Sequence, residues 1–117
     1  MSLLRWFTRN VADTRQPTHD DLAPLTLPAG DIAAAVRQAL AGLSSWAVAD
    51  VTPDAMHLTR KTRVMGYTDD VRLFLRPVPG GVQVHAESRS RVGKGDLGQN
   101  RRNILELWRA LAPRAAS

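Results

Sequence analysis

The sequence predicts a single α+β domain: a four-stranded antiparallel sheet with two helices packed on one face, in the order α-β-β-β-β-α. Two observations lead to this prediction. Strand-like alternation of apolar and polar residues fills the middle of the chain, and a helical repeat of apolar residues stands on either side of it. With 117 residues, the chain is long enough for one core but not for two. We expect an extended N-terminal arm or linker at residues 1–28, the domain at residues 29–113 and a tail at residues 114–117.

The first predicted helix starts after Asp31, a residue type that caps helix N-termini, and ends near Gly42. Its apolar face carries Ile32, Val36 and Leu40. This face predicts a helix that packs on the sheet, and the many alanines allow close approach.

The second predicted helix starts with a capping box, because Gln99 follows Asp96 at the spacing that lets the two side chains bond each other's backbone amides. Apolar residues then recur at helical spacing as far as Leu111, and Pro113 ends the run.

Four alternating segments predict the strands, at residues 44–51, 56–62, 67–78 and 81–90. We expect the first hairpin to pair Val51 with Asp54 around Pro53, and the second to turn at residues 79–80. Within the arm, residues 25–27 also alternate and are able to pair as a short edge strand, where flanking prolines are tolerated.

Pairing Val78 with Gly81 sets the register of the second hairpin, because side chains in a strand alternate between its two faces. One face then pairs apolar residues, and the other opposes Asp70 to Arg89. We therefore expect the helices to cover the apolar face and to leave the other face open. The predicted open sheet face carries Trp46, His57, Arg72, Phe74, His85 and Glu87.

The most distinctive stretch, SRSRVGKGDLGQNRRN at residues 88–103, joins a basic strand end to the second helix. Its three glycines match G-x-G-x-x-G, but the next parallel strand and an acidic residue about 20 positions later are missing, so no dinucleotide is expected. Asp69 and Asp70 point to opposite sides of a strand and cannot easily share a proton or a metal ion. We predict a cluster, either functional or structural, of Asp69, Asp70, Arg89, Arg91, Lys94, Asp96, Asn100 and Arg101.

Two motifs carry a resemblance. The string Tyr-Thr-Asp-Asp-Val at residues 67–71, and the string Ser-Arg-Ser-Arg-Val-Gly-Lys-Gly-Asp-Leu-Gly-Gln-Asn at residues 88–100, are similar to the uncharacterised family catalogued as domain of unknown function 1499. The resemblance extends from about Asn10 to Leu111. Tyr67 stands where that family commonly has Phe, and Asn103 where it commonly has Arg. The resemblance implies no catalytic residue and no cofactor.

Composition narrows the classes of function. Without cysteine, the chain has no disulfide and no thiolate site, and His57 and His85 lack a third metal ligand, so no metal is expected. The net charge of +5 is concentrated at residues 56–117, where twelve Lys and Arg face five acids. No apolar run reaches the length of a membrane span and no signal peptide is evident, so we expect a cytoplasmic protein.

Our leading hypothesis is a non-enzymatic accessory domain that binds a ligand or a protein, through the open sheet face or the basic stretch at residues 88–102. An acidic protein or an anionic small ligand is the partner that this charge favours. One alternative is an enzyme that uses Asp70 with Arg89 and Arg91 on an acidic substrate; another, less favoured, is electrostatic binding of nucleic acid. A peripheral membrane contact or a contact between copies is left open for Leu3, Leu4, Trp6 and Phe7.

Overall fold

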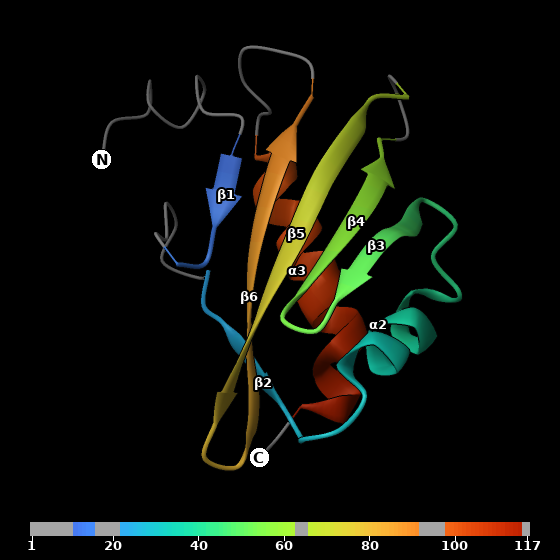
Figure 1. Ribbon diagram of the computed structural model, residues 1–117. Helices are drawn as coiled ribbons and strands as arrows, with labels where there is room; N and C mark the ends of the chain where they lie inside the picture. Colours follow the sequence, from blue (N-terminus) through green and yellow to red (C-terminus); the bar gives the residue numbers. More distant parts are fainter. Residues whose placement is uncertain (1–10, 16–21, 63–65, 92–97, 116–117) are drawn as a thin grey trace.

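The computed structural model describes residues 11–15, 22–62, 66–91 and 98–115, which form a two-layer α+β domain (Figure 1). An antiparallel sheet makes one layer, and two helices lie behind it (Figure 1). Its elements are β1 (Val11–Asp13), β2 (Leu25–Leu27), α2 (Ile32–Leu40), β3 (Trp46–Thr52), β4 (Ala55–Lys61), β5 (Thr68–Val78), β6 (Gly81–Ser90), α3 (Gln99–Leu111) and the 3-10 turn η1 (Ala112–Arg114).

The sheet of the described residues has six strands, so the prediction of four was wrong. The strand order is β1-β6-β5-β4-β3, and β2 also pairs with β6. β1 and β2 therefore lie end to end along one edge of the long strand β6, with Val11 opposite Arg89 and Leu25 opposite Val84 (Figure 1). The edge strand predicted at residues 25–27 is confirmed. β1 was missed because three residues carry too little alternation to indicate a strand without their partner.

The predicted register of the second hairpin is confirmed. Val78 pairs with Gly81 around the turn, and Asp70 stands opposite Arg89 on the neighbouring strand. β5 and β6 are the longest strands, with eleven and ten residues; β1 and β2 pair with β6, β4 pairs with β5, and β3 pairs with β4. The agreement has a physical reason: a wrong register would expose the apolar side chains of both strands.

The predicted register of the first hairpin was wrong. Thr52 pairs with Ala55, so Pro53 and Asp54 form the turn instead of the expected Thr52 and Pro53. The correct pairing places Val51 opposite Met56.

Trp46 lies on the other side of the sheet from the one predicted, because of an irregularity in β3. A register shift between Val48 and Asp50 interrupts the β3–β4 ladder, and beyond it Trp46 stands opposite Arg60. Compared with the prediction, the pairing here is displaced by one residue, and a displacement of one residue exchanges the two faces. Trp46 is 7% exposed and belongs to the core, not to the open sheet face.

The core fills the space between the sheet and the helices, and each strand contributes buried residues to it or packs partly buried ones against it. Contacts of α3 with β6 and β5, and of α2 with α3 and β3, close the layer. Burial of this apolar surface is the main stabilising term of the fold. Its fully buried apolar side chains include Leu27, Val36, Leu58, Val71, Leu73, Val84, Ile104, Leu107 and Leu111.

The two helices begin differently. Asp31 caps α2 as predicted, and its Oδ1 accepts a hydrogen bond of 3.0 Å from the amide of Ala34. The capping box predicted for the second helix was wrong, because α3 begins at Gln99 with Gly98 at the N-cap, at φ +83°. Asp96 itself lies outside the described residues. No helix in the described part of the chain combines the length and the apolar character that crossing a bilayer requires.

Candidate functional site

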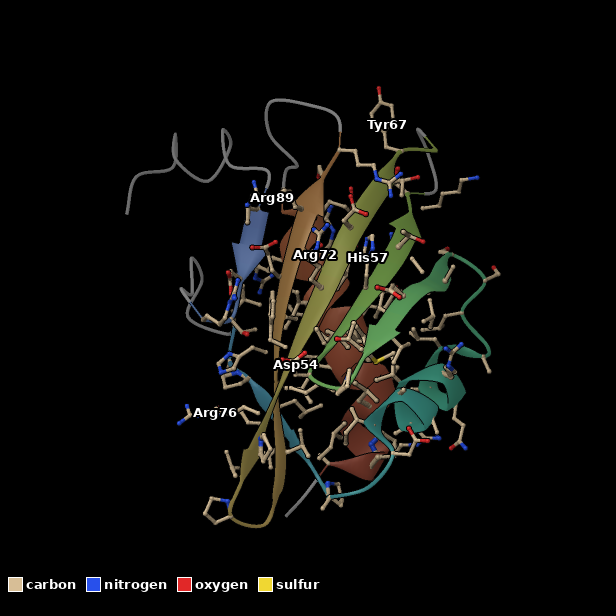
Figure 2. The ribbon with its side chains drawn as sticks, viewed as in Figure 1. Asp54, His57, Tyr67, Arg72, Arg76 and Arg89 are labelled. Carbon is tan, nitrogen blue, oxygen red and sulfur yellow. The ribbon has the colours of Figure 1, made fainter. Side chains whose placement is uncertain are left out.

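The sheet face opposite the helices is the open sheet face, and Figure 2 is viewed onto it. His57 from β4, Arg72 from β5 and Arg89 from β6 lie on this face (Figure 2). Successive side chains of a strand point to opposite faces, and each of these three residues is next in sequence to a buried one.

The carboxylate of Asp70 on this face contacts two side chains, those of Arg91 and His57. Arg91 donates from Nε to Oδ2 at 2.8 Å and from Nη2 to Oδ1 at 2.9 Å, and His57 Nε2 lies 2.7 Å from Oδ1. The hydrogen bonds from Arg91, together with the smaller effect of His57, lower the pKa of Asp70 to about 2, against the opposing effect of burial. Arg89, the neighbour across the strands, is instead nearest Glu87, at 3.9 Å.

Arg15, directly after β1, covers the aromatic ring of Phe74. Its guanidinium carbon lies 3.9 Å from the ring centroid, a cation–π contact. The same guanidinium donates to both carboxylate oxygens of Asp13, at 3.1 and 2.8 Å, and to Glu87 at 3.4 Å. Burial alone would raise the pKa of Asp13, but the hydrogen bonds from Arg15 bring it below the ordinary value. No sequence pattern indicated Arg15, because its segment is interpreted as linker from the sequence alone.

The surroundings of His85 favour its neutral form by lowering its pKa. Burial lowers its pKa, and the positive charges of Arg15 and Arg76 lower it further. Its Nδ1 lies 3.0 Å from the hydroxyl of Thr14, which in turn accepts from the amide of Ala86 at 2.9 Å. In the tautomer whose Nε2 donates to the amide oxygen of Gln83, at 3.3 Å, Nδ1 accepts from the Thr14 hydroxyl.

The open sheet face carries a surplus of positive charge. Within the described residues, Arg72, Arg76 and Lys61 have no ion-pair partner. By contrast, each carboxylate that β1, β5 and β6 present on this face is paired with an arginine: Asp13, Glu87 and Asp70. Two other acids, Asp50 on the edge strand β3 and Asp54 in the β3–β4 turn, have no ion-pair partner among the described residues. The uncompensated charge is therefore cationic over the middle of the sheet.

Asp69 lies on the opposite side of the sheet from Asp70, as strand alternation predicts, and enters a buried polar cluster. Asn103 donates from Nδ2 to Asp69 at 2.7 Å and to the hydroxyl of Ser88 at 3.1 Å. Ser88 donates to Asn100 Oδ1 at 2.6 Å, and Asn100 Nδ2 donates to Ser90 at 2.8 Å. Asp69 is 2% exposed, and Ser88, Asn100 and Asn103 are fully buried. This cluster fastens α3 to β5 and β6.

The family model described as "Protein of unknown function (DUF1499)" matches residues 7–111. This chain belongs to that family. No curated protein and no solved structure matches it significantly. The match covers nearly the whole chain.

The predicted cluster of this DUF1499 protein is divided by the sheet. Asp70, Arg89 and Arg91 lie on the open face, whereas Asp69 of β5 and Asn100 of α3 are buried between the sheet and that helix. Arg101 is half-buried in the first turn of α3, and Lys94 lies outside the described residues, like Asp96. Asn103 and Ser88 were not predicted as members, although a serine at a core position of the predicted register was a signal for a buried hydrogen bond.

A third polar group stands where Trp46 meets α3. Glu106 accepts hydrogen bonds from the indole Nε1 of Trp46 and from Arg60 Nε, the latter at 2.9 Å. Burial would raise the pKa of Glu106, but these two donors lower it below the ordinary value. The group satisfies the one polar atom of the buried tryptophan and ties the β3–β4 hairpin to the helix.

Two observations concern metal binding and proton transfer by the residues of the open sheet face. Between residues 11 and 115, as far as they are described, no three His, Cys, Asp or Glu side chains lie close enough to share a metal ion. Asp70 is a carboxylate at neutral pH and is fixed by Arg91, so it has no proton to donate there. The arrangement suits the recognition of negative charge by the unpaired arginines.

Proposed function

We propose that this DUF1499 protein is a non-enzymatic binding domain that holds an acidic protein partner on its open sheet face. The observation that carries the proposal is the imbalance on this face: Arg72 and Arg76 have no ion-pair partner, while the carboxylates of the central strands are already neutralised. A cationic surface of this kind attracts acidic partners and raises their rate of association.

The distribution of aromatic residues favours a protein over a single-stranded nucleic acid. Stacking of bases requires an accessible aromatic face, and Phe74 is covered by Arg15. Trp46 is buried on the other side of the sheet, and Tyr67 directly precedes the first residue of β5 (Figure 2). Ion pairing without stacking is therefore the dominant interaction that this face offers.

The state of Asp70 argues against the enzymatic alternative. A general acid or base works best when its pKa is near the working pH, whereas the pKa of Asp70 is about 2. Arg91, one of the two arginines of that hypothesis, is paired with the same carboxylate. In our proposal, the ion pair of Asp70 with Arg91 is structural and holds the C-terminal end of β6 against β5.

The proposal is tested with a fluorescent oligoglutamate peptide as the acidic probe, by fluorescence anisotropy at low and at physiological salt. We expect binding that weakens as salt rises, and a loss of affinity of about fivefold to tenfold in the double variant Arg72→Gln/Arg76→Gln, from two exposed ion pairs. The matched control is Arg37→Gln/Arg109→Gln, which removes the same charge from exposed positions on α2 and α3.

Equal losses in the two double variants would contradict the proposal, because net charge alone would then explain the binding. Tighter binding of a single-stranded oligothymidylate than of an oligoglutamate of equal charge would assign the face to nucleic acid instead. Circular dichroism of both variants checks that the fold is retained.

A further inference from the structure

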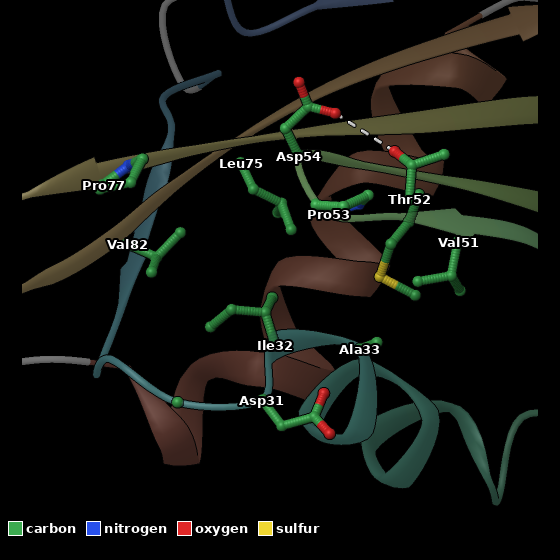
Figure 3. A pocket seen from close by; sticks show the side chains of 12 residues that line it. Asp31, Ile32, Ala33, Val51, Thr52, Pro53, Asp54, Leu75, Pro77 and Val82 are labelled. Carbon is green, nitrogen blue, oxygen red and sulfur yellow. Dashed lines mark hydrogen bonds between the residues drawn. The ribbon is translucent and has the colours of Figure 1, made fainter.

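A cavity of about 570 Å³ opens at the end of the domain away from the buried polar cluster (Figure 3). It lies between the start of α2, the β3–β4 turn and the free end of the β5–β6 hairpin. Ile32, Leu75 and Val82 point into the hollow, one from each of α2, β5 and β6 (Figure 3). Its volume is within the range of small-molecule sites in proteins.

The lengths of the elements explain why this space is not filled. β5 and β6 have eleven and ten residues, whereas β3 and β4 have seven each, so the hairpin extends past its neighbours. α2 has nine residues and presents Ala33 at this point, a side chain too small to reach across. Apolar surface of the hairpin is therefore left facing a cavity rather than a helix.

The lining of the cavity is apolar inside and acidic at its edges. Val51, Met56 and Leu75 belong to the apolar wall. Asp31 and Asp54 are the charged residues of the lining, and it contains no Lys, Arg or His. Their carboxylates lie at the periphery in Figure 3. The chain as a whole has a net charge of +5 and attracts anions. The two carboxylates at the edge of this cavity act locally in the opposite sense and disfavour an anionic ligand there.

We propose that this cavity binds a small cationic amphiphile, a molecule with an alkyl chain or an apolar ring and an ammonium head. The apolar part displaces water from the hollow among Ile32, Leu75 and Val82, and the ammonium stays at the rim beside Asp54. The site is separate from the open sheet face, and the opposite charge of its ligand distinguishes the two.

The test compares three probes with the same chain, decylammonium, decanol and decanoate, below their micellar concentrations. Binding is followed through the methyl ¹³C shifts of Ile32, Val51, Leu75 and Val82, which report on the cavity itself. We expect saturable binding of decylammonium with one site, at least about fivefold tighter than that of decanoate. The net positive charge of the protein alone would produce the reverse order.

Two kinds of variant localise the ligand. Ala33→Phe places a ring in the hollow and should abolish binding; if it does not fold, Val51→Phe, at a partly exposed position of β3, narrows the same cavity. Asp54→Asn keeps an oxygen for its hydrogen bond with Thr52 and should weaken decylammonium about twofold to fivefold, whereas the control Asp50→Asn should not.

Three results would overturn the proposal. One is unchanged binding in a folded Ala33→Phe protein. Another is decanoate or decanol binding as tightly as decylammonium, which would remove the assignment of a cationic head. The third is the absence of saturable methyl shifts with all three probes.

Discussion

Asn103 on α3 donates a hydrogen bond of 2.7 Å to the carboxylate of Asp69 on β5, and both side chains are buried. The last helix is thus attached to the sheet by a polar contact at one end and by apolar packing along the rest of its length. A buried carboxylate is tolerated only where donors surround it, so this contact has a direct consequence for stability.

Replacing Asn103 with alanine removes donors to both Asp69 and Ser88. We expect the free energy of unfolding to fall by about 1–3 kcal/mol, since buried polar groups lose a partner. Urea denaturation measures the change, with Gln38→Ala at an exposed position of α2 as the control. A loss no larger than that of the control would show that Asp69 does not depend on this donor.

Acid should weaken the fold through Asp70. Its pKa is about 2 in the folded protein and 3.8 in the ordinary state, so the folded state binds the proton less readily than the unfolded chain. The stabilisation from the ionised Asp70 is present above the ordinary pKa of 3.8, and it is lost as the pH falls from there to the folded-state pKa of about 2. Denaturation of the wild type and of Asp70→Asn at a series of pH values should give two curves that converge at the acid end. Parallel curves would be inconsistent with the ion pair.

Glu106 should matter more as an acceptor than as a charge. Glu106→Ala leaves the buried indole N–H of Trp46 and the guanidinium of Arg60 without this partner, and we expect a loss of about 1–3 kcal/mol. Glu106→Gln keeps an acceptor oxygen and should lose less. Thermal melting followed by tryptophan fluorescence compares the two, and equal melting temperatures would refute the role of the hydrogen bonds.

The two glycines of the β5–β6 turn should respond differently to alanine. A Cβ on Gly81 would lie 2.1 Å from the backbone oxygen of Leu27, so Gly81→Ala must displace β2. We expect a loss of about 1–3 kcal/mol or more from this overpacking. Gly80, at φ +89°, has open space around it, and Gly80→Ala should show only backbone strain, of about 1 kcal/mol. A larger effect at Gly80 would mean that β2 does not pack here.

Local patterns were sufficient wherever neighbouring residues decide the structure. Asp31 caps α2 because the cap depends on an amide three residues away, and the hairpin from Thr68 to Ser90 follows from alternation and its turn. The same reasoning failed for Trp46, because a register shift between Val48 and Asp50 changed which face Trp46 occupies. A bulge inserts one residue without changing the apolar pattern enough to be recognised.

The candidate sites depended still more on contacts between distant segments. Arg15 reaches Phe74 only because β1 pairs with β6, and a strand of three residues cannot be recognised without that partner. The partner of Asp70 is Arg91 rather than the opposed Arg89, since long side chains choose among several neighbours. The apolar cavity arises from the unequal lengths of two hairpins, which no single segment reveals.

The sequence by itself determined the fold class, the two helices, the β5–β6 register, the opposite directions of Asp69 and Asp70 and the family resemblance. These follow from periodicity, capping and turn residues, which act over a few positions of the chain. Only the tertiary structure decided the two added strands, the burial of Trp46, the ion pairs of the open sheet face and the cavity. Each of these is set by a balance of pairing and packing between segments far apart in sequence, and that balance exists only once the chain has folded.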